Sequence, residues 1–218
     1  MIPIAYEKGS RTRQAILDTS RQLFAENGFT QTDIKDIAKS LGITHTAIYY
    51  YFKNKNDIAS EIYDIETDKI ITYIKEIRQE NRYSPLFICI LQYKLMVENL
   101  AFNPATEDFF FNMIDYRMYD RYELSRVREE YYAPLSYLFE TKGINKSEDE
   151  MTIFILTSDA YAKALLSAIK RGAVDYSISD AFDYFFIHLI LPDIDVSFDE
   201  YKITKSAVEE FLRLNPYS

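Results

Sequence analysis

Hydroxyl and amino groups that suit phosphate binding gather in one short stretch of the sequence, Thr44–Lys55. If this stretch is helical, Ile48 and Phe52 turn inward and Tyr49 and Tyr50 face out. Exposed tyrosines are unusual on a plain surface, but their hydroxyls donate well to phosphate oxygens. The pattern therefore predicts a surface that grips the backbone of a nucleic acid.

Catalytic chemistry has little support in the sequence. The chain has two histidines and one cysteine, and no metal-ligand spacing, glycine-rich phosphate loop or nucleophile elbow is present. Acid pairs such as Glu129-Glu130 are ordinary for a solvated helix face. We expect no enzyme, no metal and no cofactor.

The sequence favours a cytoplasmic protein. Met1 to Gly9 lacks an apolar signal core, and Cys89 has no second cysteine to pair with. The apolar run Leu86 to Leu91 falls far short of the ~20 residues that a membrane helix needs.

Charge is divided unevenly along the chain. The net charge of −9 would repel DNA. Residues 1–55, however, hold eight basic and five acidic residues and carry +3, which leaves −12 on residues 56–218. A basic head on an acidic body would orient the molecule toward DNA, although so modest an excess also arises by chance.

Apolar spacing of three and four predicts helices throughout. A first helix is expected over Ser10–Asn27, ended by Gly28, and a second from about Asp33, capped by Thr32 or Asp33. Gly42 breaks the chain before a third short helix capped by Thr44, and Asn54 caps a long fourth.

Later helices have readable starts and ends. Ser84-Pro85 and Asn103-Pro104 pair a capping residue with proline, and Ser147 and Ser197 precede a glutamate at capping-box spacing. The sequence Lys170-Arg171-Gly172 suits a helix end. We expect an all-α chain with a helix-turn-helix DNA-binding domain at 1–55 and a helical ligand-binding and dimerisation domain at 56–218, joined by the fourth helix.

Roughly residues 11–62 contain a series of short motifs in order: Gly28-Phe29, Asp36-Ile37-Ala38, Leu41-Gly42-Ile43-Thr44 and the run Ala47-Ile48-Tyr49-Tyr50-Tyr51-Phe52-Lys53-Asn54-Lys55. On these residues the stretch resembles the TetR/AcrR family of bacterial regulators. Two positions depart from the family pattern, which often has glycine at Thr46 and Thr or Ser at Asp33.

The resemblance implies a DNA-binding transcriptional regulator, a repressor that a small molecule releases from double-stranded operator DNA. The DNA contacts that it implies are Thr32, Thr44, His45, Thr46, Tyr49, Tyr50, Lys53 and Lys55. Because no Arg, Asn or Gln is placed for bidentate base reading, the operator sequence does not follow.

The resemblance also implies a ligand pocket and a homodimer. Aromatic and acidic residues in the body suit a small hydrophobic ligand, neutral or cationic, with Phe109, Met113 and Tyr116 as candidate contacts. Small and apolar residues suit a two-fold interface, with Ala160, Ala164, Ala168, Phe182, Phe186 and Leu189 as candidates. Plain internal core is the alternative for both sets. A ligand-independent regulator, an activator and a helical protein-binding adaptor also remain open.

Overall fold

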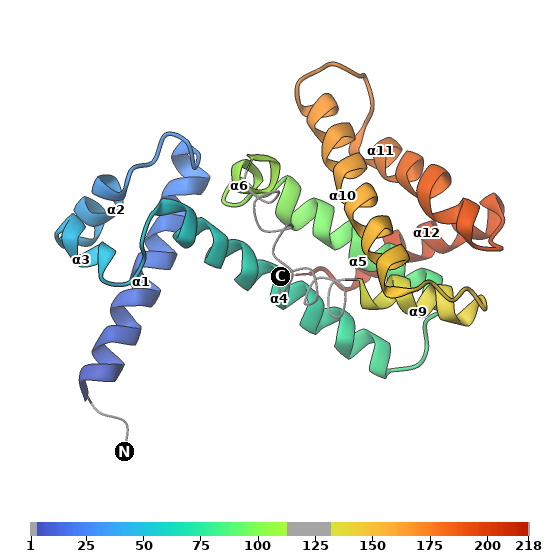
Figure 1. Cartoon of the computed structure of the whole chain (residues 1–218), viewed down its shortest axis with the longest axis horizontal. Coiled ribbons are helices and arrows are strands. Elements are labelled where there is room, and N and C mark those ends of the chain that lie inside the picture. Colours follow the sequence, from blue (N-terminus) through green and yellow to red (C-terminus); the bar gives the residue numbers. More distant parts are fainter. Residues whose placement is uncertain (1–3, 113–131, 218) are drawn as a thin grey trace. The chain divides into compact units, whose positions relative to one another are not determined.

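The computed structural model describes residues 4–112 and 132–217, and their regular structure is helical, with no strand in those two ranges (Figure 1). The expectation of an all-α chain is confirmed. The helices belong to two compact units. The described part of the first unit is residues 4–69 with 97–112, and that of the second is residues 70–96 with 132–217.

The first unit begins with one long helix, which two short helices follow. Its helices are α1 (Ile4–Asn27), α2 (Ile34–Leu41), α3 (His45–Tyr49) and the N-terminal part of α4 (Lys55–Gln79), with a π-helical turn (Val97–Ala101) and α6 (Glu107–Asn112). Gly28 ends α1 at φ 83°, and its N–H donates to the Phe24 carbonyl at 2.9 Å. Positive φ favours glycine, so this helix end was readable from the residue type.

Periodic apolar residues close the core of this unit. Phe24 and Phe29 meet edge-to-face with centroids 5.3 Å apart, which ties the end of α1 to the turn after it. Fully buried apolar side chains of α1 to α4 here include Ile16, Leu17, Phe24, Ile37, Ile48, Ile58 and Ile62. The two short helices, α2 and α3, are thus held by packing rather than by their length, since helices this short are marginal alone.

The second unit is built round α5 (Pro85–Met96). Its other helices are the C-terminal part of α4, α9 (Ala133–Thr141), α10 (Glu148–Lys170), α11 (Ile178–Phe185), a π-helical turn (Phe186–Ile190), a 3-10 turn (Leu191–Asp193) and α12 (Phe198–Leu214). All residues from Leu86 to Leu91 are buried. A helix that is apolar on every side must be covered on every side, and α5 packs against both α9 and α12.

Local signals set most helix starts in this unit. The Ser84 hydroxyl accepts from the Phe87 N–H at 3.2 Å, and Ser147 forms a reciprocal capping box with Glu150. Ser197 caps α12 by accepting from the Glu200 N–H. In the first unit, Asn103 accepts from the Ala105 N–H at 2.9 Å, but α6 begins only at Glu107, because the residues between form turns.

Phe186 corrects one expectation. It was predicted to lie at a dimer interface, but its side chain is fully buried between Tyr93, Phe182 and Tyr201. Phe182 is also buried, at 8% exposed. The repeating apolar face that begins at Phe182 therefore serves the core of its own chain.

Candidate nucleic-acid interface

The turn before α3 has the geometry that a helix-turn-helix needs. Gly42 sits in the left-handed region at φ 65°, and its N–H donates to the Lys39 carbonyl at the end of α2. Thr44 then starts α3, because its hydroxyl accepts the Ala47 N–H at 3.2 Å. Both features were expected from the sequence and both are confirmed.

One side of α3 is anchored and the other is open. Ile48 is fully buried. Tyr49 is 52% exposed and Tyr50 is 83% exposed, large fractions for aromatic side chains. Thr44, His45 and Thr46 are also exposed, and His45 lies edge-to-face with Tyr49, with centroids 6.4 Å apart. The structure thus brings five of the expected DNA contacts onto α3 and the residues directly before and after it.

The two lysines after α3 differ in their surroundings. Lys53 is exposed, and in the described parts of the chain its amino group has no carboxylate or carbonyl partner. The Lys55 amino group instead donates to the carbonyls of Phe29 and Thr32, at 2.7 Å each, and lies 4.4 Å from the centre of the Phe29 ring. Lys55 therefore ties the start of α4 to the turn between α1 and α2, which corrects its expected pairing with phosphate.

Thr32 also has an internal role. Its side chain is buried, and its hydroxyl donates to the Gly28 carbonyl at 2.8 Å. No surface is left to touch DNA, so the expected DNA contact is wrong. The cap of α2 is Asp33, whose N–H donates to the Asp36 carboxylate at 2.8 Å.

Two ion pairs that the sequence did not reveal join α1 to α4. Arg13 pairs with Glu61 through both guanidinium ends and also lies 4.7 Å from the Phe52 ring centre. Arg21 pairs with Glu66 at 2.8 Å. No local spacing rule links positions 48 residues apart, as Arg13 and Glu61 are. These pairs tie α1 to the N-terminal part of α4.

The three predicted ligand contacts stay a prediction. Met113 and Tyr116 lie outside the described residues, and the side chain of Phe109 also falls outside them. The dimer candidates separate into two groups: Phe182 and Phe186 are buried in their own chain, whereas Ala160 and Ala164 are exposed and Ala168 and Leu189 are half-buried.

An open polar helix behind a glycine turn, on an all-helical chain, defines a helix-turn-helix protein. Residues 16–62 match the family "bacterial regulatory proteins, tetR family". The N-terminal region of the chain is therefore similar to this family, as the resemblance of its sequence implied.

Curated relatives share the same N-terminal region. The transcriptional regulator AcrR of Shigella flexneri is 41% identical over 64 residues, which are 29% of this chain and 30% of AcrR. The fatty acid metabolism regulator protein of Bacillus subtilis is 36% identical over 61 residues, 28% of this chain and 31% of that protein. The matched segment thus spans about a third of the length of these relatives.

Solved structures extend the likeness to the whole fold. RolR, solved in complex with the ligand resorcinol, aligns with a TM-score of 0.67 at 14% identity, over 92% of this chain and 95% of RolR. AmtR of Mycobacterium smegmatis aligns with a TM-score of 0.52 at 15% identity, over 93% of this chain and 94% of AmtR. The TM-scores show a common fold, and at identities this low the likeness shows the fold alone.

Proposed function

We propose that this chain is a cytoplasmic DNA-binding transcriptional regulator, a repressor that a small molecule releases from its operator. The observation that carries the proposal is the open face of α3, where Tyr49 and Tyr50 are exposed while Ile48 anchors the helix in the core. Relatives of the N-terminal region support it, since BepR of Brucella suis, 40% identical over 55 residues that are 25% of this chain and 26% of BepR, is a transcriptional repressor by name.

Backbone contacts would supply most of the affinity. The hydroxyls of Tyr49 and Tyr50 and the unpaired ammonium of Lys53 donate to phosphate oxygens. The remaining hydroxyls of Thr44 and Thr46 and the ring of His45 approach the groove at the start of α3, where a recognition helix reads base edges. Phosphate contacts release counterions, so affinity falls steeply as salt rises.

The test is fluorescence anisotropy with duplexes obtained by selecting genomic fragments that the full chain binds. We expect affinity to fall by an order of magnitude or more between about 50 and 200 mM salt. Tyr49→Phe and Tyr50→Phe, which keep the ring and lose the hydroxyl, should each weaken binding by roughly tenfold. Tyr176→Phe, at an exposed tyrosine of the second unit, is the matched control. No selected fragment, or affinity insensitive to salt, would refute DNA binding.

A homodimer completes the proposal. One short helix reads few bases, whereas two heads span half-sites one helical turn apart. Along α10, the exposed positions Ile153, Thr157, Ala160 and Ala164 recur every three or four residues and form one stripe. This helix is apolar and long enough to cross a membrane, and only 22% of its most apolar 18-residue window is buried within the chain. An apolar surface this open suits a second copy of the chain, and small side chains let two helices approach closely.

A ligand would act through the conformation of the two heads. RolR, which shares the fold, was solved with resorcinol, and this supports a small molecule as the effector. Since α4 is continuous from Lys55 to Gln79, it is one of the covalent connections between the two units. Linkage makes the effect reciprocal: DNA weakens ligand binding by the factor by which ligand weakens DNA binding.

A further inference from the structure

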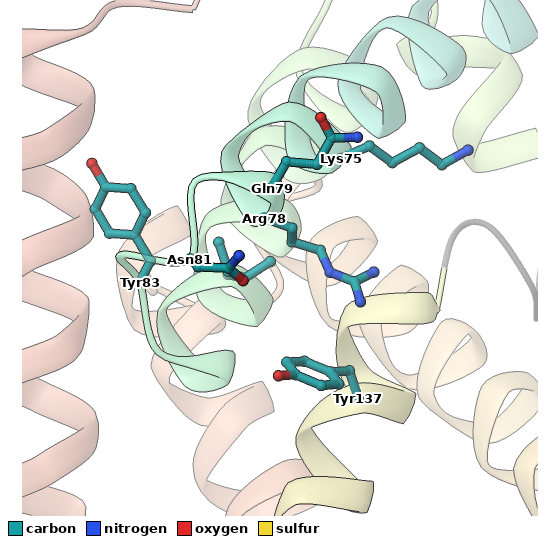
Figure 2. Close-up of a pocket in the computed structure, with 7 residues that line it drawn as sticks. Lys75, Arg78, Gln79, Asn81, Tyr83 and Tyr137 are labelled. Carbon is teal, nitrogen blue, oxygen red and sulfur yellow. The ribbon is translucent and has the colours of Figure 1, made fainter.

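A hollow at the end of α4 has a lining that is opposite in charge to the body around it. It has a volume of about 660 Å³ and is lined by Lys75, Arg78, Gln79, Asn81, Tyr83, Ile88 and Tyr137 (Figure 2). The lining contains two cations and no carboxylate, whereas residues 56–218 carry −12 in total. Its volume falls in the range of roughly 300–1,000 Å³ that small-molecule sites occupy.

Arg78 is held in place without being neutralised. Its guanidinium lies 5.1 Å from the centre of the Tyr137 ring, and Figure 2 shows it extended from α4 toward that ring on α9. In the described parts of the chain it has no ion pair or side-chain hydrogen bond. Glu80, a nearby acid, pairs with Arg82 instead. Stacking on an aromatic face orders a guanidinium while its edge keeps the N–H donors.

Neutral donors and rings complete the lining. Asn81 adopts the left-handed conformation at φ 53°, which ends α4 and places an amide in the lining. The Tyr83 ring is fixed by stacking on the Phe87 ring, with the two ring centroids 4.5 Å apart. Rigid rings beside an ordered cation suit a flat apolar group that carries a negative charge.

We propose that this hollow binds a small organic carboxylate with a flat ring, the carboxylate on Arg78 and the ring against Tyr137. A planar guanidinium offers two parallel N–H donors that match the two oxygens of a carboxylate, a geometry that a lysine ammonium lacks. Lys75 adds a second positive charge at the rim. The site is distinct from the aromatic segment where the sequence placed a neutral or cationic hydrophobic ligand, and it rests on no part of the DNA-binding proposal.

The probes are benzoate, benzylamine and inorganic phosphate, titrated calorimetrically into the full chain without DNA. Benzoate should bind saturably at one site per chain, and benzylamine, with the same ring and the opposite charge, should not. Phosphate should bind at least several-fold more weakly than benzoate. Equal or tighter binding of phosphate or benzylamine overturns the assignment to ring-bearing carboxylates.

Variants locate the site. Arg78→Gln should weaken benzoate binding by about tenfold or more, Arg78→Lys by less, and Tyr137→Leu by a few-fold. Arg171→Gln, at an exposed arginine just after α10, removes the same charge elsewhere and should leave affinity within about twofold. Thermal unfolding checks that each variant folds, and Arg78→Lys serves if Arg78→Gln does not. Equal losses in Arg171→Gln and Arg78→Gln, or none in either, would overturn the proposal.

Discussion

At the scale of single residues, Lys53 and Lys55 show how neighbours of one type take different roles. Lys53 is exposed and without an ion-pair partner in the described chain, whereas Lys55 donates to two main-chain carbonyls beyond the end of α1. Carbonyls after a helix end need donors when they are partly buried. Lys55 meets this need, and a lysine that does so contributes to folding of the head.

Replacing Lys55 by Ala should therefore destabilise the protein by about 1–3 kcal/mol, since two hydrogen bonds from a charged donor are lost and two carbonyls are left without them. Lys53→Ala should leave the unfolding temperature unchanged and weaken DNA binding by a few-fold through the loss of one phosphate contact. Denaturant unfolding and anisotropy on both variants measure the two effects. An unchanged midpoint for Lys55→Ala would contradict the structural role.

Residue type and local spacing predicted the parts of the site that depend on neighbours in sequence. Gly42 and Thr44 form the turn and the cap that their types indicated, and Tyr49 and Tyr50 are exposed as the position of Ile48 required. The errors, Thr32 and Lys55, arise where a side chain donates to main-chain carbonyls, within the same turn for Thr32 and more than 20 residues away for Lys55. Whether a polar group faces solvent or its own main chain is decided by tertiary packing, which spacing does not encode.

At the scale of elements, the residues at helix ends predicted where helices begin and end, whereas the apolar faces did not predict what each helix packs against. Gly28, Ser84 and Ser147 act at helix ends as their types predicted. The faces of the later helices were harder, because an apolar stripe looks the same whether it packs inside one chain or between two. For this reason the sequence placed Phe186 at an interface, although its side chain is buried inside its own chain.

The start of α10 gives a pH prediction. The pKa of Glu150 is lowered because the Ser147 hydroxyl and N–H both donate to its carboxylate. Because the folded pKa lies below the ordinary value of 4.5, this group stabilises the fold above about pH 4.5, and the effect disappears as pH falls through the folded pKa. Ser147→Ala should lower the unfolding temperature at pH 7, and the gap to the parent should narrow below pH 4.5.

Thermal unfolding between pH 7 and 3.5 measures this gap, and Glu150→Gln provides the control because it removes the titrating group itself. The gap between Glu150→Gln and the parent should narrow in the same pH window. A gap for Ser147→Ala that stays constant down to pH 3.5 would show that the carboxylate plays no part in the cap.

At the scale of the whole molecule, the charge division and the proposed dimer act together. A head of +3 attracts phosphate while a remainder of −12 is repelled by it, so each copy would approach DNA head first. Two copies joined away from the heads present two such surfaces at once. Binding by one head then raises the effective concentration of the other at the neighbouring half-site.

The exposed stripe on α10 is where this dimer is testable. In a two-fold interface each copy contributes the same patch, so Ala164→Glu would bury one carboxylate from each copy, where unpaired charges are costly. We expect the parent to be a dimer by light scattering at micromolar concentration and Ala164→Glu to be a folded monomer with weakened DNA binding. Ala207→Glu, at an exposed alanine of α12, adds the same charge and should stay dimeric. A dimeric Ala164→Glu, or a monomeric parent, would place the interface elsewhere or remove it.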